Sequence, residues 1–477
     1  MRTQTAQVSA GRKLNVVEID GFRGQLIQAG HADYDIARAV WNGAIDRRPR
    51  LIARCTGPTD VVAAVRFARE HGLEIAIRGG GHNVAGTAVC DDGIVIDLSA
   101  MRGVRVDPRG RKAWVQGGAL WGDVDHETQV HGLATTGGIV SHTGVAGLTL
   151  GGGVGWLMRK HGLTVDNLLA ADVVTADGER LRASKDEHPD LFWALRGGGG
   201  NFGVVTSFEF RLHSLGPTVL AGPILWDARD AGEVLRFYRD FLRDAPDELG
   251  TVVRFGTAPP FAVIPEGLHW RPVLMIGTCY AGPVEDGEKA LRPLRALRTP
   301  LLDLVGPVPY VGFQSAIDST VPHGWSYYWK STHLPALRDE LIDVIVAHAF
   351  SASSPRSYVA LFHLRGAVGC MAEGGTAFGN RHATHAITLD GVWRPGDDYG
   401  ERDTAWARSF FAALGPFREG VYVNFLSNDE DPDRVQEAYG DSIYGRLVEV
   451  KTTYDPDNVF HHNQNIRPKS SEVRRPG

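Results

Sequence analysis

The chain has 477 residues, of which 43% are hydrophobic and 22% are charged, and its formal net charge at pH 7 is −6. A chain of this length and composition is expected to form two or three globular domains. The negative charge argues against a general binder of nucleic acid or of membrane surfaces. The first 25 residues carry no long apolar region and no later run reaches membrane-spanning length, so we expect a cytoplasmic enzyme.

The cysteines and the paired histidines show no metal pattern. Cys55, Cys90, Cys279 and Cys370 have no C-x-x-C spacing, which indicates ordinary reduced or buried thiols. The adjacent pair at 461–462 has no third ligand in view, so a surface position is favoured over a metal site.

A glycine-rich loop lies between two predicted strands near the start of the chain. The alternating apolar residues of 73–77 and the apolar run 94–98 predict the strands, and the loop reads I-R-G-G-G-H-N-V-A-G over residues 77–86. Consecutive glycine N–H groups form a concavity that binds anions, and Arg78 adds a charge suited to phosphate. In a Walker or Rossmann site a helix follows the loop, so this unit is of another kind. A plain tight turn is the competing interpretation, and His82 directly behind the loop favours a ligand site.

Two more glycine-rich blocks follow, at residues 135–156 and 190–206. So many glycines argue against a regular helix in the first block. The second block is expected to form a short helix, a glycine turn and a strand. Three such blocks between residues 77 and 206 predict one extended cofactor with several points of contact.

After residue 217 the glycine blocks end and the pattern changes. Alternating residues predict strands at 252–256, 273–280, 358–364, 383–389 and 422–426. Helical runs are expected at 230–243, 334–349 and 404–414, with an earlier short one around 37–44. Strands mixed with helices in this way predict a separate α+β domain with an antiparallel sheet. A helix at 441–451 and a tail rich in Asp and Asn then end the chain.

Four motifs in this order resemble the berberine-bridge-enzyme-like flavoproteins of the vanillyl-alcohol-oxidase superfamily. They are R-G-G-G-H at 78–82, G-G-G-V-G-W at 151–156, L-R-G-G-G-G-N-F-G-V-V-T at 195–206 and Y-D-P-D-N-V-F-H-H-N-Q-N-I at 454–466. The resemblance implies an α+β, two-domain, PCMH-type FAD-binding fold. Its FAD domain would comprise residues 1–216 and be completed by the berberine-bridge-like segment 440–477. Residues 217–439 would form a substrate domain whose antiparallel sheet is covered by helices.

The resemblance implies FAD bonded covalently to the protein. His82 stands at the family's histidine ligand, and a neutral imidazole is a suitable nucleophile towards the flavin methyl carbon. Many relatives attach FAD a second time through a cysteine, and this chain has Val140 there, so a single attachment is expected. The residues placed at the cofactor are Arg78, Gly79, Gly80, Gly81, His82, Asn83, Gly86, Gly137, Ser141, His142, Thr143, Gly144, Gly147, Leu148, Gly152, Gly153, Gly155, Asp166, Asn167, Asn201, Gly203, Val204, Asn463 and Asn465.

A second departure concerns the catalytic base. The run Tyr422–Phe425 has phenylalanine where many relatives have a tyrosine base, and phenylalanine cannot exchange a proton. Asp390 is the candidate base or anchor for a cationic substrate, with Thr388 on the same face of its strand. A solvated turn residue before Gly391 is the competing interpretation of Asp390. Tyr422 is a further catalytic candidate, and the expected substrate contacts are Tyr328, Lys330 and Phe425.

These residues predict an FAD-dependent oxidase that abstracts a hydride from a small organic substrate, with O₂ as the acceptor. The missing tyrosine favours an amine, an N-heterocycle or a secondary metabolite, because oxidation of a neutral amine needs no strong base. Two alternatives remain open: a flavin dehydrogenase of an alcohol or sugar, and a non-redox cyclase of natural-product biosynthesis. The expected partners are the substrate and oxygen, with no nucleic acid and no membrane.

Overall fold

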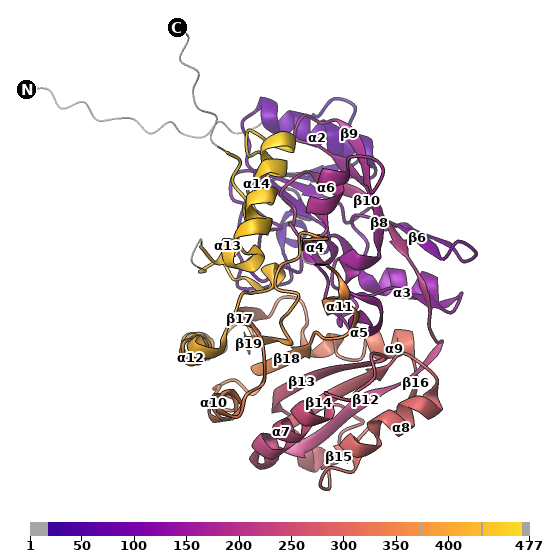
Figure 1. Cartoon of the computed structure of the whole chain (residues 1–477). Helices are drawn as coiled ribbons and strands as arrows, with labels where there is room; N and C mark the ends of the chain where they lie inside the picture. Colours follow the sequence, from indigo (N-terminus) through magenta and orange to yellow (C-terminus); the bar gives the residue numbers. More distant parts are fainter. Residues whose placement is uncertain (1–17, 373, 431–432, 470–477) are drawn as a thin grey trace, which may run out of the picture.

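The computed structural model describes residues 18–372, 374–430 and 433–469. The outer ends of the first and last predicted segments, 1–17 and 470–477, lie outside the described residues. The chain forms two parts, an upper one rich in glycine loops and a lower one built on a large sheet (Figure 1). None of the helices in the described ranges combines the length and the apolar character that crossing a membrane requires.

The upper part contains two main sheets and a small ribbon. The first has the order β1 (Gln25–Ile27), β2 (Leu51–Arg54), β4 (Ile94–Asp97), β3 (Ile75–Arg78), and its last three strands are parallel. The second is antiparallel, with the order β5 (Val104–Asp107), β6 (Lys112–Gln116), β10 (Val204–Arg211), β8 (Leu168–Val174), β9 (Arg180–Ser184). The ribbon pairs β7 (Leu133–Ala134) with β11 (His213–Ser214). The helices of this part are α1 (Tyr34–Arg38), α2 (Pro58–Glu70), α3 (Trp121–Gln129), α4 (Val145–Gly151), α5 (Met158–His161) and α6 (Pro189–Leu195).

The lower part is an antiparallel eight-stranded sheet. Its order is β15 (Leu302–Asp303), β12 (Thr218–Asp227), β14 (Pro272–Tyr280), β13 (Leu249–Thr257), β18 (Tyr358–His363), β19 (His385–Trp393), β17 (Ser326–Leu334), and β16 (Gly306–Pro309) also pairs with β12. Four helices cover the face turned away from the upper part: α7 (Ala231–Phe241), α8 (Val284–Arg295), α10 (Asp339–Ala349) and α12 (Gly400–Ala413) (Figure 1). Two short helices, α9 (Tyr310–Gln314) and α11 (Ala367–Cys370), lie between the two parts.

Residues along the central strands alternate between these helices and the upper part, because successive side chains of a strand point to opposite faces. On β13, Val253 and Phe255 are fully buried in the core beneath the helices. Val252 and Arg254 face the glycine loops of the upper part instead. The open face of the sheet is therefore the one that can build a site.

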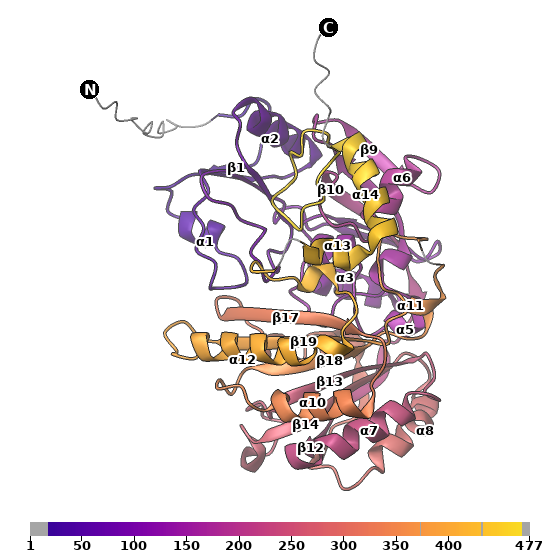
Figure 2. The ribbon, with the colours of Figure 1, turned by 60° about the vertical axis from the view of Figure 1, so that its left-hand side comes forward.

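The end of the chain returns to the upper part. Helix α13 (Asp433–Tyr439) leads into α14 (Asp441–Tyr454), which runs alongside α6 (Figure 2). Leu447 and Ile466 are fully buried in one core with Leu191 and Phe202. The tail is thus part of the same folded unit as the second and third glycine blocks.

One fully buried lysine joins the tail to the third glycine block. The Lys451 ammonium donates to Asp455 Oδ2 at 2.6 Å, to the carbonyl of Asn201 at 2.8 Å and to the carbonyl of Phe460 at 2.9 Å. Both side chains of the ion pair are 0% exposed. Asp455 in turn accepts from the backbone N–H groups of Val459 and Phe460. Every donor of the ammonium is satisfied, which a buried charge requires.

Several sequence predictions need correction. Residues 422–426 are not a strand: Val423–Phe425 forms a single 3-10 turn. The second glycine block, 135–156, does contain a helix, α4; a Cβ on Gly151 at its end would lie 2.2 Å from the Asn424 side-chain oxygen, whereas Gly147 has open space around it. The helix expected around 37–44 instead occupies Tyr34–Arg38.

We expect Lys451→Met to lower the free energy of unfolding by about 3–5 kcal/mol, because it leaves the Asp455 carboxylate buried without its partner. Lys469→Met is the matched control: its ion pair with Glu449 joins two side chains that are more than 60% exposed, and losing it should cost less than about 1 kcal/mol. Urea unfolding of both variants measures the difference. Equal stabilities for the two variants would contradict this account of Lys451.

Candidate functional site

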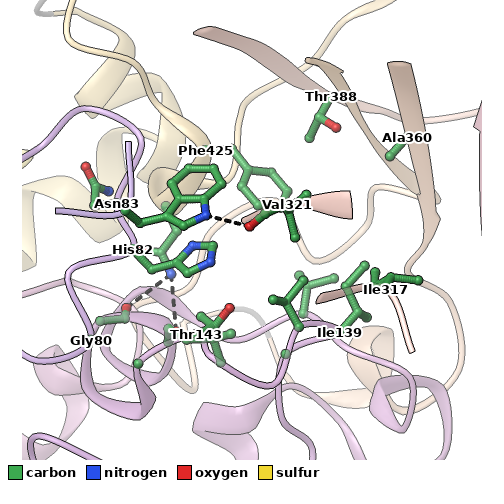
Figure 3. A pocket seen from close by; sticks show the side chains of 18 of the residues that line it. Gly80, His82, Asn83, Ile139, Thr143, Ile317, Val321, Ala360, Thr388 and Phe425 are labelled. Carbon is green, nitrogen blue, oxygen red and sulfur yellow. Dashed lines mark hydrogen bonds between the residues drawn. The ribbon is translucent and has the colours of Figure 1, made fainter. Parts of the chain in front are cut away.

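A cavity of about 870 Å³ lies between the glycine loops and the open face of the eight-stranded sheet. Figure 3 looks into it: His82, Asn83 and Thr143 come from the loops, while Thr388 and Ala360 come from the sheet. Ligand pockets typically measure about 300–1,000 Å³, so this cavity can hold a large ligand.

The first two glycine blocks meet backbone against backbone at one wall. A Cβ atom on Gly80 would lie 2.5 Å from the Gly144 Cα, and one on Gly144 would lie 2.4 Å from the Gly80 nitrogen. Only glycine permits this approach. Twelve of the residues predicted to bind the cofactor line the cavity: Gly79, Gly80, Gly81, His82, Asn83, Thr143, Gly144, Gly147, Leu148, Asn201, Gly203 and Asn463.

The third glycine block and the tail form the adjoining wall. Asn201 accepts from the Ile466 N–H at 2.9 Å and donates to the Gly198 carbonyl at 2.9 Å, so it links the two segments. Asn463 donates to the Gly200 carbonyl at 3.2 Å. Its side-chain oxygen is buried and has no hydrogen-bond partner among the described residues. An acceptor left free at a cavity wall suits a polar ligand.

His82 lies flat against an aromatic ring at the middle of the cavity. Its ring is stacked on Trp41 at 4.2 Å between centroids and 14° between planes. Trp41 is fixed by a bond from its indole N–H to the Val321 carbonyl at 2.8 Å, seen in Figure 3. Burial lowers the pKa of His82 to about 3, so the imidazole is neutral at physiological pH. Its Nε2 atom is buried without a partner in the described part of the chain.

Two further imidazoles lie next to His82 but outside the cavity lining. The His142 ring is 5.0 Å from His82 and 5.0 Å from His323. Burial lowers the pKa of His142 and of His323. Ser141, beside His142, donates its hydroxyl to Asp318 at 2.5 Å. The predicted cofactor contacts of Ser141 and His142 are therefore not evident in the structure.

The sheet wall carries a buried carboxyl group. Asp390 is 1% exposed, which excludes a solvated turn. The Thr388 hydroxyl donates to its Oδ2 at 2.5 Å. Burial raises the pKa of Asp390 to about 7, although the Thr388 bond and the charge of Arg254 oppose that rise. Asp390 can therefore both accept and release a proton near neutral pH.

Two neighbours of Asp390 were missed by the sequence analysis. Tyr358 is paired with Asp390 across the β18–β19 ladder, and Arg254 lies one strand further, opposite Ala360. The Arg254 guanidinium is 4.5 Å from the centre of the Tyr358 ring. The sequence pattern that could have identified Arg254 is its place as the single arginine in the apolar run 252–256, where the two-residue period of a strand puts it on the same face as Val252.

Phe425 and Tyr422 line the cavity between its two walls. Phe425 packs edge-on against Trp329 at 5.8 Å and against Tyr422 at 4.8 Å. The Tyr422 hydroxyl accepts from the Gly153 N–H and from Asn424, both at 2.8 Å. Burial raises the pKa of Tyr422 to about 12, so it stays protonated at neutral pH and is a poor base.

Tyr328 and Lys330, the predicted substrate contacts, do not line the cavity. On β17 these two residues alternate with Trp329, which is the one that lines the cavity. Lys330 instead forms ion pairs at 3.0 Å with Asp429 and with Glu430. The Tyr328 hydroxyl donates to Asp429 at 2.8 Å.

Arg78 does not reach the cavity either. Its buried guanidinium donates to the carbonyls of Ala37 and Arg38 and so holds α1 against the first sheet. Other predicted cofactor contacts also lie outside the lining. Asp166 pairs with Arg381 at 2.7 Å, and Asn167 donates to the His161 carbonyl at 2.9 Å. The rest of this group comprises Gly86, Gly137, Gly152, Gly153, Gly155, Val204 and Asn465.

The cavity is almost free of charged side chains. Within the described part of the chain, Arg254 is the sole lysine or arginine in its lining, and Asp390 is the sole carboxylate. Cys55, Cys90, Cys279 and Cys370 all lie outside the lining, whereas Val140 is part of it.

Two family models match the chain. The one described as "FAD binding domain" covers residues 49–184, and the one described as "Berberine and berberine like" covers residues 421–467. (R)-6-hydroxynicotine oxidase of Paenarthrobacter nicotinovorans is 34% identical over 468 residues, which is 94% of this chain and 98% of that protein.

Solved structures show the same fold. That of 6-hydroxy-D-nicotine oxidase from Arthrobacter nicotinovorans superposes with a TM-score of 0.83 at 31% identity, over 94% of this chain and 99% of that one. Glucooligosaccharide oxidase from Acremonium strictum, which carries a 6-S-cysteinyl, 8α-N1-histidyl FAD, has a TM-score of 0.83 at 24% identity, over 93% and 97% of the two chains.

We expect Gly144→Ala to cost about 1–3 kcal/mol of stability and to weaken FAD retention, because the new methyl group pushes the first two glycine blocks apart. Gly445→Ala is the control: this glycine lies exposed in α14 with no atom within 4 Å of an added Cβ. The control should gain up to about 1 kcal/mol and keep its FAD. Thermal unfolding and the FAD-to-protein absorbance ratio measure both effects, and unchanged values for Gly144→Ala would refute the tight contact.

Proposed function

The chain belongs to the berberine-bridge-type FAD-linked oxidoreductases, and we propose that it oxidises a small organic substrate in the cavity and passes the electrons to O₂. One observation carries the proposal. Asp390, a buried carboxyl with a pKa of about 7, lies on the sheet wall of a cavity whose other wall is formed by the glycine blocks. A catalytic base works best when its pKa is close to the working pH.

The residues of the upper wall suit FAD. Glycine backbone at Gly79–Gly81, Gly144 and Gly200 can offer N–H groups to a pyrophosphate without needing a cationic side chain. The Asn463 side-chain oxygen and the His82 Nε2 atom, neither of which has a partner among the described residues, supply polar atoms along the same wall.

We propose that FAD is bonded covalently to His82 alone. The imidazole is neutral, is held flat by Trp41 and keeps one nitrogen free of any hydrogen bond within the described residues. The bond to the flavin methyl carbon would replace a C–H bond there, and the bound flavin would supply the acceptor for the released electron pair. Val140 lines this cavity, and none of the described lining residues is a cysteine. We therefore expect no counterpart of the 6-S-cysteinyl bond of glucooligosaccharide oxidase.

The protein's part in the oxidation is positioning and proton transfer. When bound, FAD supplies the two-electron acceptor. Asp390 takes the proton from the substrate's O–H or N–H group, and the Thr388 hydroxyl stabilises the carboxylate form. The apolar rings of Phe425 and Trp329 keep water from the reacting centre.

Asp390 changes what Phe425 implies about the substrate. The missing tyrosine pointed to an amine or N-heterocycle, which needs no base. With Asp390 in the wall, both an amine and an alcohol can give up a proton to the protein. The two oxidases compared above act, by their names, on a nicotine derivative and on a glucooligosaccharide, so family membership does not choose between these classes.

We also propose the domain division 1–216, 217–439 and 440–477, with the last segment completing the FAD domain. The core that α14 and Ile466 share with Leu191 and Phe202 supports this division. The bonds of Lys451 to Asn201 and Phe460 support it as well.

The class of reaction is tested by mixing the holoenzyme with candidate substrates without oxygen. Secondary amines, hydroxylated N-heterocycles, sugars and phenolic alcohols form the panel. Bleaching of the yellow flavin is the expected result, with hydrogen peroxide formed once oxygen is admitted. Turnover of an authentic substrate without bleaching would indicate non-redox chemistry, and bleaching without peroxide would indicate a dehydrogenase.

We expect denaturing electrophoresis to show flavin fluorescence on the protein band, and His82→Ala to abolish it. His142→Ala is the matched control, because its imidazole is 5.0 Å from His82 and lies outside the lining; this variant should keep the signal. Peptide mapping should find one flavinylated peptide and no cysteinyl adduct. Fluorescence that persists in His82→Ala would show that another residue is the ligand.

We expect the rate of flavin reduction to rise with pH through about 7 and then level off, because the ionised form of Asp390 is the base. Asp390→Asn should lower this rate roughly 10²–10⁴-fold and remove the rise. Thr388→Val should move the rise to higher pH, since it removes the bond that stabilises the carboxylate, whereas Thr388→Ser should leave it in place. Stopped-flow reduction across pH measures each variant, and a parental profile in Asp390→Asn would rule this residue out as the base.

A further inference from the structure

Arg254 is a charged group that the oxidation chemistry does not use. It lies at the middle of β13, faces the cavity and is the sole cationic side chain among the described lining residues. Burial lowers its pKa, with the charges of Tyr358 and Asp390 acting in the opposite direction. A guanidinium nevertheless remains protonated in proteins. The cavity therefore contains a permanent positive charge.

The donors of Arg254 are not satisfied by the protein. No side-chain hydrogen bond and no ion pair joins its guanidinium to any residue of the described ranges. The one close contact is with the face of the Tyr358 ring, at 4.5 Å. A ring face attracts the charge but accepts none of the five N–H donors in the guanidinium plane. Arg254 is half-buried and lines the cavity, so its donors are available to an oxygen of a bound ligand.

The neighbours of Arg254 do not balance its charge. Across the two ladders it faces Met275 and Ala360, neither of which has a charged atom. Asp390 is near enough to act on its pKa but forms no ion pair with it within the described chain. Since Asp390 has a pKa of about 7, it carries only part of a negative charge at neutral pH. A net positive charge is left at this end of the cavity.

An apolar recess adjoins Arg254. Met275, its partner on β14, packs in one cluster with Phe261, Ile264 and Leu304, and all four line the cavity. A ligand that satisfies both features has an oxyanion for the guanidinium and an apolar body for the recess. Arginine suits this role, because its planar fork matches the two oxygens of a carboxylate.

We propose that Arg254 is a specificity-determining residue which binds an oxyanion of the substrate, so that this oxidase acts on an apolar molecule bearing a carboxylate or a phenolate. The inference rests on the proposed function, because it assigns the substrate class to the same cavity. It also revises one expectation: Asp390 is a proton acceptor here and not an anchor for a cationic amine, which Arg254 would repel.

Binding is tested with the holoenzyme by calorimetry, which needs no turnover. Benzoate is the carboxylate probe, 4-nitrophenolate is the phenolate probe, and benzamide is the neutral probe of the same shape. We expect benzoate or 4-nitrophenolate to bind at least tenfold more tightly than benzamide. The probe that binds distinguishes the two sources of the oxyanion. Equal binding of all three, or no binding of either anion, overturns the proposal.

Variants then test whether Arg254 is the residue that binds the anion. Arg254→Gln should weaken binding of the preferred anion roughly 10- to 150-fold and leave benzamide unchanged. Arg254→Lys should retain part of the preference, because it keeps the charge without the fork. Arg356→Gln is the matched control: its guanidinium also stacks on rings, 5.1 Å from Trp270 and from Trp325, but lies outside the lining. It should bind all probes as the parent does.

The remaining outcomes separate this inference from the proposed function. If Arg254→Gln weakened the anion and benzamide equally, or released FAD, the residue would serve the cofactor or the fold, and the inference would be wrong while the oxidase proposal stood. If anion binding depended on Arg254 but no substrate bleached the flavin, the oxidase proposal would fail and the oxyanion site would remain. Should Arg254→Gln fail to fold, the comparison of Arg254→Lys with Arg356→Lys decides in its place.

Discussion

The buried ammonium of Lys451 is the contact on which the cavity depends. Its three hydrogen bonds tie helix α14 to the third glycine block and to the tail at Phe460. Phe460 and Asn463 of that tail are part of the cavity lining. A charge placed in a dry core is tolerated only when each of its donors finds an acceptor. Together with the Asn201 and Asn463 hydrogen bonds and the packing of Ile466, the Lys451 side chain therefore holds the tail, and with it one wall of the site, in place.

The two walls of the cavity differ in whether backbone or side chains face the ligand. The upper wall consists mainly of backbone, because glycine lets the loops approach one another and leaves N–H groups exposed to a ligand. The sheet wall consists of side chains, and both charged groups of the described lining, Arg254 and Asp390, are on it. We therefore expect backbone groups of the upper wall to bind the cofactor and side chains of the sheet wall to determine which substrate binds.

Local patterns in the sequence predicted the upper wall, and long-range pairing decided the sheet wall. The loop around His82 could be identified because its glycines and its histidine are adjacent in sequence. Arg254, Tyr358 and Asp390 come together only through the register of β13, β18 and β19, which no local pattern specifies. Lys330 shows the same limit: its strand, β17, was not among those predicted, and which of the two faces of β17 meets the cavity depends on its pairing with β19.

The strict alternation along β13 also limits how this protein can diverge. Arg254 stands between Val253 and Phe255, both fully buried beneath the helices. Replacement of a cavity-facing residue leaves these core neighbours untouched, so the recognition surface can be exchanged one position at a time. An insertion of one residue in the strand would do the opposite, because it would turn the arginine into the core and a valine into the cavity. New substrate specificity on this sheet can therefore arise by substitution of cavity-facing residues, whereas a change in strand length would disrupt the core.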